Sequence, residues 1–156
     1  MRLTHVLAGL VAASVLTAGA VMAQGADPLA AAVKARQSHM QLYAFNLGLL
    51  GGMAQGNIAY DSAAASAAAA NLAALSALDQ SRYWPMGSAA GEVEGSRALA
   101  AIWAEGSDAA AKGQALNAAA VAMAAVAGTD LASLQGAMGA LGGACGACHQ
   151  SYRQTN

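Results

Sequence analysis

Cysteine, proline, aromatic and charged residues are all scarce in this chain of 156 residues. Its two cysteines, Cys145 and Cys148, cannot form a Cys₄ zinc site, and its two prolines leave long stretches free to form helices. A formal net charge of −1 provides no basic surface for nucleic acid or an anionic membrane, so neither partner is expected. With one Phe and two Trp, side chains alone give a thin apolar core, to which a large planar cofactor would add buried area.

The N-terminal residues have the pattern of an export signal. Arg2 precedes an uncharged apolar run from Val6 to Val21, and the segment ends on the small-x-small pattern Val21-Met22-Ala23. The run is shorter than the roughly 20 residues that a membrane span needs. We therefore expect residues 1–23 to be a cleaved secretory signal peptide, residues 24–156 to form one domain, and no membrane anchor to remain.

The remaining chain is predicted to be helical almost throughout, because alanine, leucine and methionine fill the segments between turns. We expect four helices, at about 27–55, 61–79, 94–127 and 129–153, with 80–95 as the one long connection. Asp27, Asp61 and Asp130 are predicted to cap helices, and no β-type alternation is visible. The fold class is therefore all-α.

Helical spacing indicates which side chains face the core. In the last expected helix Cys145 and Cys148 belong to an apolar stripe at alternating steps of three and four, with His149 beside them. In the first expected helix the stripe contains Arg36 and Met40. A cation on a core-facing stripe needs a partner, because burying an unpaired charge is costly.

The segment Cys145-Gly146-Ala147-Cys148-His149 is a C-x-x-C-H motif, which is typical of covalent attachment of a c-type haem. On a helix the two sulfurs project from one side, so each can form a thioether, and His149 can supply the axial nitrogen to the iron. The alternatives are a redox dithiol and a structural disulfide. A redox dithiol is expected at a helix N-terminus after a strand, and a disulfide across so short a loop would stabilise little.

Three further residues are candidates for the haem site. Arg36 suits a haem propionate, although it could also reach solvent or pair with a carboxylate of the protein. Met40 either fills the core or faces the iron opposite His149, as a sixth ligand or as an apolar group over an open position. Arg153 either polarises the His149 imidazole or stabilises the helix end. His39 is a weaker alternative axial ligand, because it lies off the Met40 stripe.

Several segments together resemble cytochrome c′, the class II c-type cytochromes, over essentially the whole expected domain. They are Arg36-Gln37-Ser38-His39-Met40, the Gly56 to Asp61 turn, Trp84-Pro85-Met86-Gly87-Ser88, Ala101-Ile102-Trp103 and Gly142 to Arg153. The most specific part is the late C-x-x-C-H followed by Tyr152-Arg153.

The resemblance implies a left-handed antiparallel four-helix bundle, commonly a periplasmic homodimer, with one haem near the C-terminal helix. It also implies a five-coordinate iron that admits nitric oxide or carbon monoxide. Arg36 then matches the propionate contact, Met40 the distal residue and Arg153 the proximal basic residue. One departure is Gly146, where high-spin members usually have lysine. A low-spin subgroup uses a methionine at the place of Met40 as the sixth ligand.

Two functions follow from this resemblance, and a third from the cysteines alone. The first is a periplasmic protein that binds nitric oxide or carbon monoxide, with or without electron transfer to periplasmic redox partners. The second is an electron carrier whose Met40 sulfur closes the sixth position. The third is a thiol oxidoreductase. No catalytic constellation or phosphate-binding loop is visible, so we do not expect an enzyme.

Overall fold

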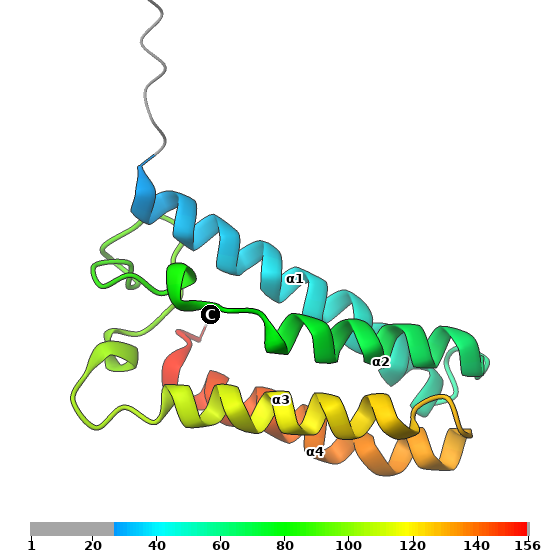
Figure 1. Cartoon of the computed structure of the whole chain (residues 1–156). Helices are drawn as coiled ribbons and strands as arrows, with labels where there is room; N and C mark the ends of the chain where they lie inside the picture. The colour runs from blue at the N-terminus through cyan, green and yellow to red at the C-terminus, as the bar shows by residue number, and fades with distance from the viewer. Residues whose placement is uncertain (1–26, 156) are drawn as a thin grey trace, which may run out of the picture.

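The computed structural model describes residues 27–155. The expected signal peptide, residues 1–23, lies outside the described residues. The chain forms four α-helices and two short 3₁₀-helices (Figure 1). In chain order they are α1 (Pro28–Ala54), α2 (Ser62–Ala77), η1 (Ser81–Tyr83), η2 (Ala100–Trp103), α3 (Ala109–Val126) and α4 (Leu131–Tyr152). Residues 27–155 contain no β-strand, only an isolated bridge between Ala98 and Arg153.

Three of the helices begin at an aspartate, as the sequence predicts. The Asp27 carboxylate accepts a hydrogen bond from the Leu29 amide at 3.0 Å, and Pro28 occupies the first turn of α1. The carboxylates of Asp61 and Asp130 each accept one from the amide three residues on, at 2.7 Å in both cases. These bonds satisfy amides that the helix itself leaves without partners.

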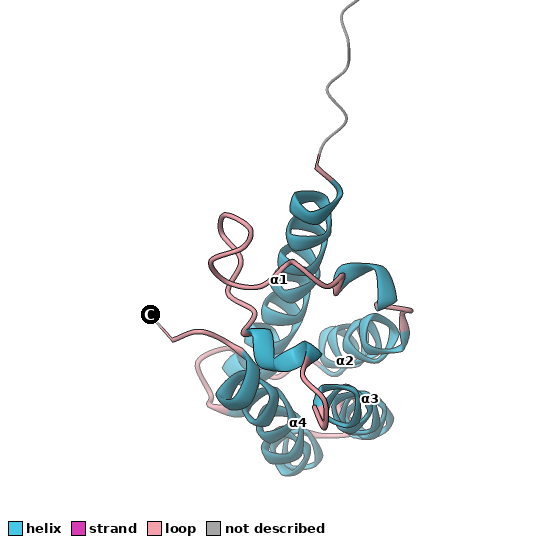
Figure 2. Ribbon diagram, turned by 90° about the vertical axis from the view of Figure 1, so that its left-hand side faces the viewer, coloured by secondary structure: helices cyan, strands magenta, loops and turns pink. Residues whose placement is uncertain are grey.

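Consecutive helices run antiparallel and pack side by side (Figure 1). Viewed from the end of the bundle, α1, α2, α3 and α4 follow one another around a common axis (Figure 2). The expected antiparallel four-helix bundle is therefore confirmed. None of the helices in residues 27–155 combines the length and apolar character needed to cross a membrane.

The third helix begins later than the sequence predicts, at Ala109 instead of residue 94. Gly95 and Gly106 have φ angles of +74° and +77°, a left-handed conformation that interrupts a helix and that glycine adopts without strain. Between them Leu99 donates its backbone N–H to the Tyr152 carbonyl at 2.9 Å. Contacts with the end of α4 thus replace helical hydrogen bonds, and residues 78–108 form one long connection across an end of the bundle (Figure 2).

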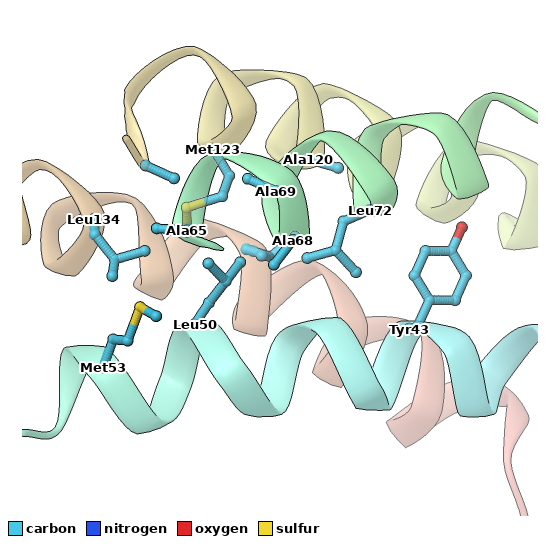
Figure 3. Packing of buried hydrophobic residues seen from close by; sticks show 12 residues of the cluster. Tyr43, Leu50, Met53, Ala65, Ala68, Ala69, Leu72, Ala120, Met123 and Leu134 are labelled. Carbon is cyan, nitrogen blue, oxygen red and sulfur yellow. The ribbon is translucent and has the colours of Figure 1, made fainter. Parts of the chain in front are cut away.

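The hydrophobic core occupies the half of the bundle that holds the α1–α2 and α3–α4 turns (Figure 3). Its larger members are Leu50, Met53, Leu72, Met123, Leu134 and Leu141, each no more than 2% exposed. Buried alanines of α2 and α3 pack between them, including Ala65, Ala68, Ala69 and Ala120. Small side chains let the helices approach closely here, whereas Tyr43 lies at the edge of the cluster.

Replacing Leu134 with alanine tests how much this core contributes. Leu134→Ala should lower the free energy of unfolding by about 2–5 kcal/mol, because it removes buried methyl groups and leaves a cavity. Urea denaturation followed by far-UV circular dichroism measures the change. Val121→Ala, at a position 53% exposed on α3, serves as the control and should change stability by about 0.5 kcal/mol or less. Equal effects of the two substitutions would contradict this location of the core.

Candidate functional site

A cavity of about 1300 Å³ occupies the half of the bundle that the core cluster does not fill. It exceeds the roughly 300–1,000 Å³ typical of small-molecule pockets, so it can hold a large cofactor. Its walls come from α1, the last turn of α2, α3, α4 and the connection between α2 and α3. The lining includes Arg36, Met40, Tyr43, Leu47, Trp84, Arg97, Ile102, Trp103, Lys112, Leu116, Cys145, Cys148, His149, Tyr152 and Arg153.

One wall of the cavity carries the C-x-x-C-H motif in the last two turns of α4. Cys145 and Cys148 are half-buried free thiols, and burial is the main cause that raises the pKa of each. A reactive dithiol needs a lowered thiol pKa, usually at a helix N-terminus. Cys145 and Cys148 have raised pKa values and lie near the C-terminal end of α4. Their placement therefore favours attachment of a group in the cavity over thiol redox chemistry.

The facing wall belongs to α1, where Met40 and Tyr43 line the cavity. Met40 is half-buried and packs against the core cluster. Tyr43 is buried, and burial raises its pKa to about 12. The Gln80 side chain lies beside its hydroxyl, but the hydroxyl forms no hydrogen bond of good geometry within the described residues. A buried hydroxyl without a partner is rare in a folded protein. The Tyr43 hydroxyl therefore indicates that a bound group occupies this cavity.

Arg36 lies on the cavity wall, but its hydrogen bonds go to the connection between α2 and α3. Nη1 donates to the Tyr83 carbonyl at 3.4 Å and the Ser88 hydroxyl at 2.9 Å. Nη2 donates to the Ser88 carbonyl at 2.5 Å and the Ser96 hydroxyl at 2.7 Å. The guanidinium also stacks on Trp84, at 4.9 Å from the ring centre. Arg36 is only 5% exposed, and no carboxylate of residues 27–155 pairs with it.

Arg153 and Arg97 line the cavity together with His149. Nη1 of Arg153 is 3.5 Å from Nδ1 of His149. Burial lowers the pKa of His149, and the positive charges of Arg153 and Arg97 lower it further. Arg97 was not singled out from the sequence, because it lies in the segment expected to be helical. Its Nη2 donates to the Gln154 carbonyl at 2.8 Å.

His39 faces a different part of the molecule. It is buried beside two tyrosine rings, with centroid distances of 4.7 Å to Tyr43 and 5.5 Å to Tyr83. The lining of the cavity, as far as residues 27–155 form it, does not include His39. This placement gives no support to His39 as a second axial ligand.

The end of α4 is fixed by contacts that the sequence does not reveal. The Tyr152 hydroxyl donates to the Asp108 carboxylate at 2.6 Å and accepts from the Asp108 backbone N–H at 3.0 Å. The backbone N–H of Gln154 donates to the Arg97 carbonyl at 2.8 Å. Because these partners lie more than 40 residues apart, no local pattern predicts them. They keep the turn that contains Cys148 and His149 from fraying.

Two tryptophans complete the lining on the side of the connection. Trp103 donates its indole N–H to the Trp84 carbonyl at 2.9 Å, so η2 is tied to the segment after η1. Both residues lie in segments that carry the resemblance to cytochrome c′. Their large apolar surfaces suit a flat, apolar occupant.

Metal binding by protein side chains alone is not supported. Residues 27–155 contain no group of three or more His, Cys, Asp or Glu side chains placed to hold a metal ion. A Cys₂His₂ site would need His39 and His149 together with the cysteines, and His39 does not line the cavity.

Comparison with known proteins identifies the family. The family model described as cytochrome c′ matches residues 31–153. The chain belongs to the cytochrome c′ family. It is 48% identical over 139 residues to cytochrome c-554 of Cereibacter sphaeroides, covering 89% of this chain and 91% of that protein. The resemblance seen in the sequence is thus confirmed.

Solved structures agree with this assignment. The structure of cytochrome c′ from Rhodobacter spheriodes has a TM-score of 0.80 at 37% identity, over 84% of this chain and all of that one. A nitric oxide complex of a variant of cytochrome c prime from Alcaligenes xylosoxidans has a TM-score of 0.70 at 35% identity, over 83% and 98%.

Membership of the cytochrome c′ family implies a c-type haem, and the cavity fits one. Two thiols and an imidazole share one wall, apolar and aromatic side chains form much of the rest, and the Tyr43 hydroxyl forms no hydrogen bond of good geometry within residues 27–155. Cys145, Cys148 and His149 are the residues that would hold the haem.

The hydrogen bonds of Arg36 predict a large structural effect of its replacement. Arg36→Lys should lower the free energy of unfolding by roughly 2–4 kcal/mol, because an ammonium cannot reach acceptors arranged around a planar guanidinium. Urea denaturation of the purified protein measures this. Arg82→Lys, at an exposed position in η1, is the matched control and should leave stability nearly unchanged. A loss no larger than in the control would show that these bonds contribute little.

Proposed function

We propose that this member of the cytochrome c′ family holds one haem c through thioethers from Cys145 and Cys148, with His149 as an axial ligand, and binds nitric oxide or carbon monoxide. The observation that carries the proposal is the single cavity that places this motif on one wall and Met40 on the facing wall. When bound, the haem supplies an iron that can take a diatomic gas or exchange an electron.

The side chains facing the motif are suited to an uncharged diatomic ligand. Met40 and Leu47 are half-buried apolar groups on the cavity wall, and apolar surroundings disfavour a charged ligand. Tyr43 presents a neutral hydroxyl to the same space at any ordinary pH, because its pKa is about 12. The nitric oxide complex of the related Alcaligenes protein supports the choice of ligand.

Arg153 affects the basicity of the His149 imidazole. A guanidinium has only hydrogen-bond donors, so Arg153 cannot accept a hydrogen bond from Nδ1–H of His149. Metal-bound histidines commonly donate a hydrogen bond from their other ring N–H to a carbonyl or carboxylate, which strengthens them as ligands. A cation at this place therefore weakens His149 as a ligand, which favours an iron with one open position.

The cellular setting and the absence of catalysis are parts of the same proposal. The N-terminal pattern of residues 1–23 and the chemistry of haem attachment both support an exported, periplasmic protein. Within residues 27–155 no Asp or Glu lines the cavity, which favours binding and electron exchange with periplasmic redox partners over enzymatic turnover.

Absorption spectra of the purified holoprotein test the proposal. Expressed in a host that matures c-type cytochromes, it should be red and keep its colour through acid-acetone extraction. The ferric form should show a broad high-spin Soret band, and the ferrous form should bind nitric oxide. Met40→Ala should leave the spin state unchanged, and Met86→Ala, at a position 78% exposed outside the cavity, is the control.

Three results would contradict this proposal. Pigment that washes out excludes covalent attachment. A low-spin ferric spectrum that becomes high-spin only in Met40→Ala identifies Met40 as the sixth ligand and the protein as an electron carrier with a closed site. A low-spin spectrum unchanged by Met40→Ala points to a different sixth ligand, such as His39 or a lysine.

We also propose that the protein is a homodimer that associates through α1. Leu42 and Phe45 are 51% and 78% exposed and lie three residues apart, so they share one face of this helix. Exposed apolar clusters of this kind mark association surfaces. Phe45 is the only phenylalanine of the chain.

Sedimentation analysis tests the dimer. The wild-type holoprotein should sediment as a dimer at micromolar concentration, and Phe45→Ser should shift it toward monomer. Met86→Ser is a matched control, because Met86 is also 78% exposed but lies outside α1. A wild-type monomer, or equal behaviour of both variants, would argue against association through α1.

A further inference from the structure

A second, smaller hollow lies between α1 and α4 and is named here the α1–α4 groove. It has a volume of about 550 Å³ and is lined by Ala44, Leu47, Gly48, Gly51, Gly52, Gln55, Asn57, Met138 and Gly142. This volume far exceeds the share of about 30 Å³ that one water molecule takes in the liquid. Ala44 and Leu47 also line the large cavity, so the two spaces adjoin at these two side chains.

Glycines on both helices keep the α1–α4 groove open. A Cβ atom added to Gly48 of α1 or to Gly142 of α4 would have no atom within 4 Å outside its own turn of helix. Glycine lowers the stability of a helix relative to alanine, and this loss is commonly offset where glycine lets another group approach the backbone closely. Neither glycine has such a neighbour in the part of the chain that the structure describes. Their missing side chains therefore provide open space between the two helices.

The lining of the α1–α4 groove is uncharged. None of the residues that form it within 27–155 carries a charge, and its two polar members, Gln55 and Asn57, lie at the end away from the cavity. The cavity, by contrast, also has Arg97, Lys112 and Arg153 on its walls. Nitric oxide and carbon monoxide are uncharged and only weakly polar. An uncharged, mostly apolar passage therefore admits them and disfavours ions.

Leu47 lies between the groove and the cavity. Its half-buried side chain lines both spaces and packs against the core cluster. One turn earlier on α1, the buried Tyr43 lines the cavity, and its hydroxyl forms no hydrogen bond of good geometry within residues 27–155. The groove thus leads past Leu47 to the part of the cavity where a bound group is indicated. A partly exposed leucine changes rotamer within nanoseconds, so Leu47 can open this passage without a movement of the backbone.

We propose that a diatomic gas enters the cavity through the α1–α4 groove, with Leu47 as the gate between the two spaces. The inference rests on the proposed function, because it takes nitric oxide or carbon monoxide as the ligand. It assigns to Leu47, Gly48 and Gly142 control over the rate of gas binding, with no part in its strength. A residue that only narrows a route raises the barrier and leaves the free and bound states unchanged.

Laser photolysis of the carbon monoxide complex of the ferrous holoprotein tests this route, and displacement by excess nitric oxide measures dissociation. Gly48→Leu and Gly142→Leu should fill the groove and lower the association and dissociation rate constants by one common factor, about tenfold. The equilibrium dissociation constant and the absorption spectrum should keep their wild-type values. The fraction of photolysed carbon monoxide that escapes to solvent should fall in both variants. Leu47→Ala should raise that fraction and both rate constants.

Two other glycine variants serve as matched controls. Gly139→Leu changes an exposed glycine of α4 that also has nothing within 4 Å of an added Cβ but lines neither space, so it should leave gas binding unchanged. Gly113→Leu changes an exposed glycine of α3 that lines the cavity but not the groove. It tests entry from the α3 side.

Xenon gives a readout that does not depend on the iron, because it occupies apolar hollows in proteins. A crystal of the wild-type holoprotein under xenon pressure should hold xenon in the groove beside Leu47, and a crystal of Gly48→Leu should not. Wild-type crystals without xenon in the groove would count against the route.

The kinetic outcomes separate this inference from the proposed function. If the wild-type holoprotein binds neither nitric oxide nor carbon monoxide, the proposed function fails and this inference fails with it. If it binds gas but Gly48→Leu and Gly142→Leu both keep the wild-type rate constants and escape fraction, only the route is overturned. A loss of rate in Gly113→Leu with none in the groove variants places entry on the α3 side and overturns it as well. A changed dissociation constant or spectrum in the groove variants shows an effect on the site itself and contradicts a role confined to entry. If Gly48→Leu does not fold, Gly142→Leu decides alone.

Discussion

Unequal filling of the bundle is the constraint on which the rest of the structure depends. Around Leu50 and Met123, alanines bring the helices close enough for leucines and methionines to fill the interior. Toward the other end, α1 and α4 carry side chains that leave about 1300 Å³ between the walls. Apolar surface around such a space gains nothing from folding unless something covers it. The same sequence therefore encodes a stable half and a half adapted to a cofactor.

The connection between α2 and α3 supplies the hydrogen-bond acceptors that allow the Arg36 cation to be buried. A guanidinium that is 5% exposed requires acceptors, and two serine hydroxyls and two backbone carbonyls provide them. These bonds also bring Trp84 onto Arg36, and Trp103 follows through its bond to the Trp84 carbonyl. A long irregular segment is thereby held as part of the cavity wall.

Features set by local spacing could be predicted from the sequence. The three aspartate caps, the inward stripes of α1 and α4, and the joint position of Cys145, Cys148 and His149 all follow from helical periodicity. Features set by distant partners could not. Ser88 and Ser96 lie 52 and 60 residues from Arg36, so the sequence shows that the arginine needs a partner but not which one.

The start of α3 was missed for a similar reason. Alanine-rich sequence between Gly95 and Gly106 favours an α-helix locally, but the left-handed glycines and the bonds to the end of α4 favour an irregular path with only the short 3₁₀-helix η2. Arg97 was overlooked with it, because its position on the cavity wall exists only when this segment is not α-helical. Tertiary contacts outweighed helix propensity over these residues.

The two main walls of the cavity come from opposite ends of the described chain, α1 and α4. Bringing them together closes almost the longest loop that this domain can form, and the entropy of that closure is lost before any contact across the cavity forms. A group bonded to α4 and packed on α1 acts as a crosslink over this loop and stabilises the folded chain through linkage. Occupancy of the cavity and closure of the domain are then one equilibrium, in which the cofactor behaves as a structural element of the protein.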